Sequence, residues 1–87
     1  MRGLLGRRSL PSDQGILLKP AASIHTFFMR FPIDAVFLDR EHRVVGIERD
    51  VRPWRTVGRR GSHAVLELPS GECQRRELAV GERLVSA

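Results

Sequence analysis

The chain of 87 residues carries a net charge of +5, with 41% hydrophobic and 29% charged residues. Such a composition excludes a disordered chain, and this length supports one domain with one modest core. No run reaches the roughly 18 consecutive apolar residues of a membrane span, and the single cysteine, Cys73, excludes an intrachain disulfide and a multi-cysteine zinc site. The basic start lacks the apolar length of a secretory signal. We therefore expect one soluble cytoplasmic domain over residues 1–87, a monomer or weak dimer without membrane contact, cofactor or metal.

The first half of the chain alternates short apolar runs with turn residues. "GLLGR" (3–7) predicts a short helical turn, "PSDQG" (11–15) a turn and "GILL" (15–18) a strand. Residues 24–29 predict another extended segment, which ends at the turn formed by Phe31 and Pro32. The clearest signal follows, because "IDAVFL" (33–38) and "RVVGIE" (43–48) are joined by the four polar residues "DREH", which is typical of a β-hairpin.

The first arm of this hairpin is apolar on both faces. Ile33, Ala35 and Phe37 point one way, while Asp34 points the other way with Val36 and Leu38. A strand of this kind is central in a sheet or curled into a small barrel. We therefore expect the Asp34 side chain to be buried.

The second half predicts one more strand, a helix and a closing strand. "HAVLEL" (63–68) places Glu67 on the reverse of its core face, Ser70 is a suitable N-cap for a helix through "GECQRREL" (71–78), and "ERLV" (82–85) closes the sheet. The sum is five or six short strands and about two short helices. This predicts a mostly β, α+β domain, built as a small sheet or a partly closed barrel.

Taken together, several blocks resemble the family called domain of unknown function 192 (DUF192). They are "GLLGR", "GILL", "HTFFMRFPIDAVFLD" with "RVVGI", and "AVLELPSG" followed by "GERL". The resemblance covers nearly the whole chain and implies a compact, largely β domain with no established activity. It also implies that this chain lacks the usual N-terminal strand of the family. Relatives often carry a cysteine just before the histidine, where this chain has Ala21, Ala22 and Ser23.

Asp34 is the first candidate for a functional residue. A buried carboxylate costs several kcal/mol if it is ionised and unpaired, so it must be partnered, neutral or partly wet. In the structural interpretation it accepts hydrogen bonds within the "HTFFMRFP" segment, with His25, Thr26 or Arg30 as side-chain partners. In the functional interpretation His25 or Thr26 stands beside it in a site.

The remaining candidates come from the same segment and from the later strand. His25 has a pKa suited to proton transfer, although a lone histidine is more often a satisfied core or rim residue. Met29, Phe27 and Phe28 are most simply core residues, and Glu67 could form with Asp34 the carboxyl pair that acid–base chemistry requires. The candidate ligand-binding residues are His25, Thr26, Met29, Asp34 and Glu67.

Arginine supplies almost all of the positive charge, with fourteen Arg against one Lys. Biased codon usage explains such a skew, so the distribution of the arginines is more informative than their number. Five of them surround Trp54, where a local positive charge attracts phosphate or another polyanion unless the loop is simply solvated surface. These candidate anion-binding residues are Arg49, Arg52, Arg55, Arg59 and Arg60.

Three function classes remain open. The first is a binding or accessory module for a ligand or protein partner, and it is favoured because the others lack motifs. The second is nucleic-acid or polyanion binding through residues 49–60. The third is a small enzyme that uses Asp34 and His25, but the sequence contains no nucleophile with its base and no metal set, so catalytic residues are unknown and an enzyme is not the expected result.

Overall fold

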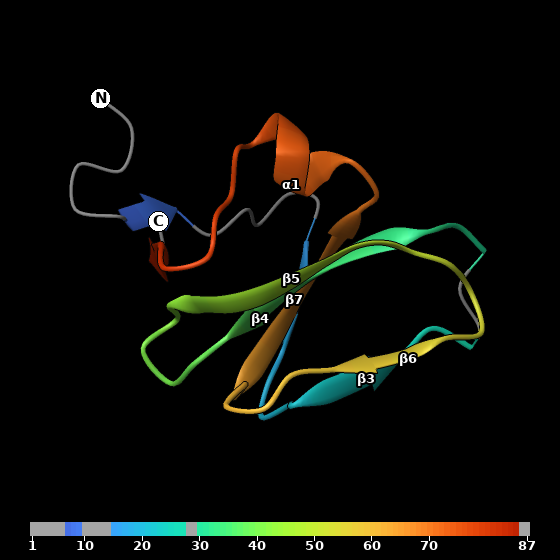
Figure 1. Ribbon diagram of the computed structural model, residues 1–87, viewed down its shortest axis with the longest axis horizontal. Coiled ribbons are helices and arrows are strands. Elements are labelled where there is room, and N and C mark those ends of the chain that lie inside the picture. The colour runs from blue at the N-terminus through green and yellow to red at the C-terminus, as the bar shows by residue number, and fades with distance from the viewer. Residues whose placement is uncertain (1–6, 10–14, 28–29, 86–87) are drawn as a thin grey trace.

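A computed structural model describes residues 7–9, 15–27 and 30–85. These residues form eight short strands and one helix (Figure 1). The elements are β1 (Arg7–Ser9), β2 (Ile16–Leu18), β3 (Ser23–His25), β4 (Ile33–Leu38), β5 (Val44–Val51), β6 (Thr56–Gly58), β7 (Ala64–Pro69), α1 (Glu72–Arg75) and β8 (Arg83–Val85). The expected mostly β, α+β class is confirmed. The helical turn expected at residues 3–7 lies almost wholly outside the described residues, as does Met29.

The strands form one four-stranded sheet and two ribbons of two strands each. The sheet is antiparallel in the order β2-β7-β4-β5, the ribbon of β3 and β6 is antiparallel, and β1 pairs with β8 in parallel. Strands β2 and β5 stand at the two ends of the sheet order. The sheet is therefore open, and the barrel alternative does not apply.

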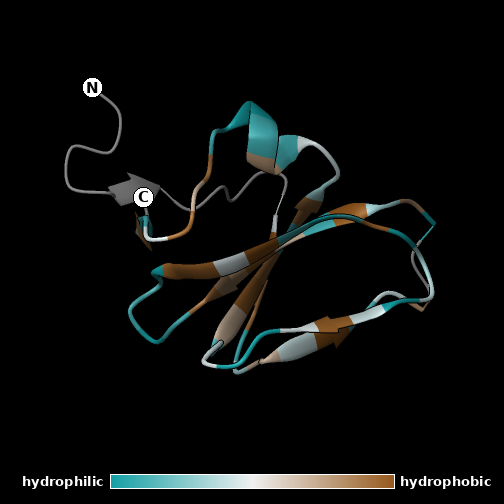
Figure 2. Cartoon of the chain, in the orientation of Figure 1, coloured by the Kyte–Doolittle hydropathy of each residue, from teal (hydrophilic) through white to brown (hydrophobic). Residues whose placement is uncertain are grey.

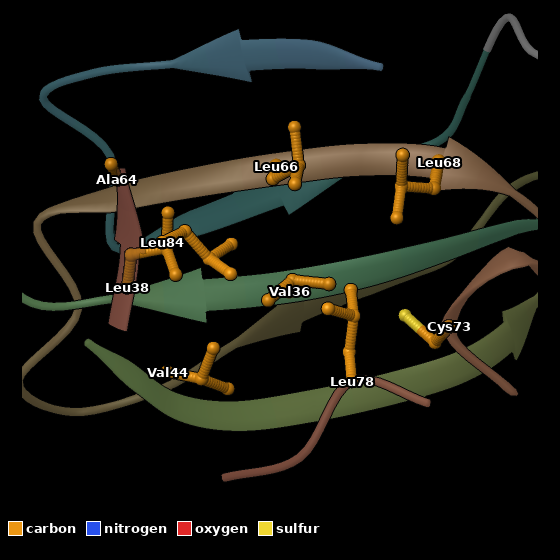
Figure 3. Packing of buried hydrophobic residues seen from close by; sticks show 9 residues of the cluster. All are labelled: Val36, Leu38, Val44, Ala64, Leu66, Leu68, Cys73, Leu78 and Leu84. Atoms are coloured by element: carbon orange, nitrogen blue, oxygen red, sulfur yellow. The ribbon is translucent and has the colours of Figure 1, made fainter. Parts of the chain in front are cut away.

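Strand β4 is buried on both faces, as its sequence predicts, because a separate layer covers each face. On one side, Val36 and Leu38 pack with Leu66 of β7, Leu78 and Leu84 (Figure 3). On the other side the β3–β6 ribbon supplies the cover, with a cluster made of Ile24, Ile33, Ala35, Phe37, Val51 and Val65, against which Val57 packs. In Figure 2 the strands of the sheet are largely hydrophobic, whereas α1 is mostly hydrophilic.

The β4–β5 hairpin forms at the residues that the sequence predicts. One Asp39 carboxylate oxygen accepts hydrogen bonds from the backbone N–H groups of Glu41 (2.8 Å) and Arg43 (2.9 Å), which closes the turn. Strand β5 continues beyond the predicted arm to Val51, with a register shift opposite the segment between Ile33 and Ala35. This extension brings the Asp50 backbone alongside Asp34.

Candidate functional site

Asp34 is buried, with 1% of its surface exposed. Its carboxylate accepts hydrogen bonds from three backbone N–H groups, which belong to Asp50 (2.9 Å), Gly71 (3.0 Å) and Cys73 (3.0 Å). The expected burial is confirmed, but the expected partners within "HTFFMRFP" are wrong. Strand pairing brings β5 and the start of α1 to the carboxylate from distant parts of the chain.

The bonds of Asp34 explain how α1 begins. The expected N-cap, Ser70, makes no cap; the helix has Gly71 at its N-cap position, without a side-chain cap bond, and extends only from Glu72 to Arg75. The Ser70 hydroxyl instead donates to the Asp50 carboxylate at 2.8 Å. The first N–H groups of a helix lack partners within the helix and usually bond to the side chain of a nearby N-cap residue. Here Asp34, which is on strand β4, accepts their hydrogen bonds instead. The bonds of Asp34 join β4 to β5 and to the start of α1.

Cys73 lies beside the same carboxylate and is a buried free thiol. Burial, together with the neighbouring charge and hydrogen bond of Asp34, raises the pKa of the thiol to about 12. With this pKa, the thiol is almost entirely protonated near neutral pH. Because the thiolate is the reactive form, Cys73 is a poor nucleophile in the folded domain.

Glu67 does not form a pair with Asp34, because the two side chains are on opposite faces of the sheet. Glu67 is opposite Ala35 in the ladder, whereas Asp34 is opposite Leu68. The glutamate that shares the face of Glu67 is Glu48, which flanks Ala35 from β5. The hypothesis of an Asp34–Glu67 acid–base pair is therefore wrong.

Glu67 itself is nearly buried, with 9% of its surface exposed. Its carboxyl group makes no hydrogen bond or ion pair with another residue in the described part of the chain. Burial raises the pKa of its carboxyl group above 4.5. Glu67 is on β7, which is next to the edge strand β2. Its partner in β2, Ile16, is exposed.

Thr26 is buried and connects the end of β3 to the loop between β5 and β6. Its hydroxyl accepts a hydrogen bond from the backbone N–H of Arg55 (3.0 Å) and donates to the carbonyl of Arg52 (2.7 Å). Its own backbone accepts from the N–H of Trp54 (3.0 Å) and donates to the carbonyl of Arg55 (2.8 Å). One threonine therefore holds the whole loop from Arg52 to Arg55.

The side of the β3–β6 ribbon that faces away from the sheet is exposed. Because Ile24 and Thr26 are buried, the alternating residues of β3 and its continuation face outward. We call this surface the outer ribbon face, and it consists of the exposed residues Ser23, His25, Phe27, Trp54, Thr56 and Gly58. It contains no carboxylate.

Three rings of the outer ribbon face are in contact: His25 is tilted against Phe27, and Phe27 stacks on Trp54. The ring centroids of His25 and Phe27 are 5.0 Å apart at 36°, and those of Phe27 and Trp54 are 5.5 Å apart at 25°. Phe27 is 38% exposed and Trp54 62% exposed. The expectation that Phe27 is a core residue is therefore wrong, and Phe28 lies outside the described residues.

The backbone of Trp54 adopts a left-handed conformation, with φ of 66°. A bulky residue rarely adopts this conformation, which costs roughly 1–2 kcal/mol relative to the right-handed one. The hydrogen bonds from Thr26 hold the loop on both sides of Trp54. The loop is thus maintained in a strained form that projects an indole into solvent.

The five arginines of residues 49–60 do not form one patch. Arg52 and Arg55 are exposed and flank Trp54 in the loop. Arg59 reaches over β5, where its guanidinium is 3.6 Å from the Glu48 carboxylate and occupies the space that a Cβ on Gly46 would need. Arg49 lies on the side of Cys73, whose thiol pKa it lowers, and Arg60 is exposed in the turn after β6.

The sequence candidates therefore divide into two groups. His25, Thr26, Arg52 and Arg55 meet at the outer ribbon face or directly behind it, while Asp34 is inside the domain and contacts α1. Sequence reasoning missed Phe27 and Trp54 as paired surface rings. The alternation of exposed His25 and Phe27 with buried Ile24 and Thr26 is a period-two signal that could have identified Phe27.

The described residues contain no group of three or more His, Cys, Asp or Glu side chains arranged to hold a metal ion. Among the same residues, no helix has the length and hydrophobicity needed to cross a membrane.

Comparison with solved structures reveals the same fold in a crystal structure of a protein of unknown function from Novosphingobium aromaticivorans. The TM-score is 0.73 at 23% identity, and the match covers 86% of this chain and 59% of that one. At this identity the likeness concerns the fold alone.

Curated relatives carry the name UPF0127 protein. The chain is 39% identical over 64 residues to the protein from Thermococcus sibiricus, which covers 72% of this chain and 41% of that relative. It is also 39% identical over 64 residues to the protein from Pyrococcus abyssi, again 72% of this chain and 54% of the relative. The chain thus spans about half the length of these relatives. The model of the DUF192 family, described as "Uncharacterized ACR", matches residues 1–86, and the chain belongs to this family.

Proposed function

We propose that this domain is a binding module whose ligand is a polyanion and whose ligand surface is the outer ribbon face together with the adjoining Arg52–Arg55 loop. The observation that carries the proposal is the Arg52–Arg55 loop, in which two exposed arginines flank an exposed indole beside two further rings. Guanidinium groups bind phosphate and carboxylate oxygens in bidentate geometry. The ligand surface therefore offers two cations next to an apolar platform.

The charge around this surface supports a negatively charged ligand. None of the six residues of the outer ribbon face is acidic, and the chain carries a net charge of +5. Two carboxylates are nearby. Glu48 is 3.6 Å from the Arg59 guanidinium, and Asp50 accepts a hydrogen bond from the hydroxyl of Ser70. Arg59 thus offsets the charge of Glu48, and a polyanion that approaches Arg52 and Arg55 is attracted by their guanidinium groups and by the net positive charge of the chain.

The rigidity of the loop also supports binding. The hydroxyl of Thr26 bonds to Arg52 and Arg55, so the backbone positions of both arginines are set before a ligand arrives. A preorganised surface loses less conformational entropy on binding. This distinguishes the Arg52–Arg55 loop from an ordinary solvated loop.

The enzyme alternative has no comparable support. Its two residues, His25 and Asp34, are in different layers: His25 is on the outer ribbon face, and Asp34 is on the opposite side of the sheet against α1. The Asp34 carboxylate is already engaged by three backbone N–H groups.

A cytoplasmic location and a monomeric or weakly dimeric state belong to this proposal. The cytoplasm contains abundant polyanions and keeps a thiol such as Cys73 reduced.

The test measures binding to a fluorescein-labelled oligothymidylate of 15 nucleotides over a range of NaCl concentrations. The double variant Arg52→Gln/Arg55→Gln removes two phosphate contacts, so the slope of log Kd against log salt should flatten by about 1.4 for a single strand. The matched control, Lys19→Gln/Arg40→Gln, removes the same charge from two exposed residues and should retain the parent slope.

If the parent binds neither this oligonucleotide nor inorganic polyphosphate at low salt, the proposal is wrong. Equal losses in both double variants would also overturn it, because they would make net charge, rather than the Arg52–Arg55 loop, the determinant of binding.

A further inference from the structure

The rings of the outer ribbon face go beyond what a polyanion requires. Phosphate groups need cations and hydrogen-bond donors, and they gain nothing from exposed apolar rings. Yet Phe27 and Trp54 stack at 5.5 Å with their rings only 25° from parallel, next to Arg52 and Arg55. A ligand that uses both features carries anionic groups and flat apolar rings on one chain.

We infer that the polyanion is a single-stranded nucleic acid whose unpaired bases stack on Trp54, the end of the ring row that Phe27 supports, while Arg52 and Arg55 bind its phosphates. This inference rests on the proposed polyanion binding. Every base presents a flat π face, and combining aromatic platforms with a positively charged surface is a general mode of binding single strands. In a duplex the base faces are already covered by their neighbours, so the rings select unpaired strands.

The backbone of Trp54 provides an independent argument. At φ of 66°, glycine or asparagine would make the turn with little strain, whereas an indole makes it at a cost. The ring is 62% exposed, so burial offsets only part of that cost. The strained loop therefore holds a large exposed ring where a ligand can reach it.

The rings also form a continuous row. It begins at His25, continues through Phe27 and ends at Trp54, with centroid spacings of 5.0 and 5.5 Å. Thr26 is buried behind the rings and ties their two chain segments together. The platform is therefore rigid before binding, and its outer edge at Trp54 adjoins the two arginines.

The experiment uses the intrinsic fluorescence of Trp54, which is the single tryptophan in a chain without tyrosine. Oligothymidylate of 15 nucleotides is compared with an abasic oligonucleotide of the same length and with a 15-base-pair duplex. Stacking of a thymine on the indole should quench the emission. The abasic strand keeps the phosphates but should bind roughly 5- to 150-fold more weakly and leave the emission unchanged.

Variants locate the effect on the surface. Phe27→Ala and Trp54→Gly should each weaken binding of the labelled oligothymidylate at least fivefold, measured by anisotropy. Glycine suits the positive φ, so Trp54→Gly should remain folded, which circular dichroism verifies. Phe31→Ala provides the matched control, because Phe31 is 57% exposed and takes no part in the stack.

The outcomes separate this inference from the proposed function. If abasic and thymidine strands bind equally, without quenching, polyanion binding stands and base stacking is refuted. If the duplex binds as tightly as the single strand, the inference is also wrong. If none of the three probes binds, both proposals fail, and a protein partner becomes the occupant that the aromatic and arginine side chains fit.

Discussion

Asp34 and Glu67 are in adjacent register rows of one sheet, yet their carboxyl groups are on opposite faces. Asp34 is opposite Leu68 and Glu67 is opposite Ala35. The carboxylate of Asp34 accepts three backbone N–H bonds beside α1, whereas the carboxyl group of Glu67 makes no hydrogen bond with another described residue. We therefore expect these two buried acids on neighbouring strands to have opposite effects on stability.

We expect Asp34→Ala to destabilise the fold by about 3 kcal/mol or more. The change leaves three N–H groups without their acceptor, and each buried unsatisfied group costs about 1–3 kcal/mol. Asp34→Asn retains one oxygen and should cost less. Urea unfolding of both variants measures the order, and an Asp34→Ala variant as stable as the parent would refute the anchoring role.

Glu67→Gln should stabilise the domain at neutral pH. Because burial raises the folded pKa above 4.5, the folded state retains the proton longer, and the stability of the parent falls as pH rises between 4.5 and the folded pKa. Each unit of that rise corresponds to about 1.4 kcal/mol. The gain from Glu67→Gln should therefore be small below pH 4.5 and reach its full size above the folded pKa.

Urea unfolding at pH 4 and pH 8 measures the gain, with Glu41→Gln as the control at an exposed glutamate. A gain from Glu67→Gln that is equal at the two pH values would contradict desolvation of Glu67 as its cause.

Thr26→Val should destabilise the domain by about 1–3 kcal/mol. Valine has nearly the shape of threonine but neither accepts the N–H of Arg55 nor donates to the carbonyl of Arg52. The released loop should also change the emission of Trp54. Thr56→Val is the matched control, since Thr56 is exposed. Equal unfolding midpoints for the two variants would show that Thr26 does not hold the loop.

Cys73 should resist thiol reagents as long as the domain is folded. Its thiol is buried and has a pKa of about 12, so the thiolate that reacts is almost absent at pH 8. Labelling with a chromogenic disulfide should therefore follow unfolding and become rapid in urea. Rapid stoichiometric labelling without denaturant would disprove this environment.

Local patterns were sufficient to predict the hairpin and the burial of Asp34. Strand β4 has apolar residues on both of its faces. Such a strand is suited to a central position in a sheet, where both faces are covered. Asp39 closes its turn through bonds to residues two and four positions later, so the signal and the contact are in the same short segment. The two arms therefore required no knowledge of the rest of the chain.

Only the tertiary structure decided what surrounds these elements. Two of the donors to Asp34 are 37 and 39 residues away, and the third is on a part of β5 that the pattern did not extend to. Strands β3 and β6 have three residues each, which is too few to show a clear period-two pattern. They form a ribbon only because they pair directly with one another. That pairing brings Phe27 to Trp54 and turns separate aromatic residues into an exposed stack, because ring contacts depend on register between segments rather than on spacing along the chain.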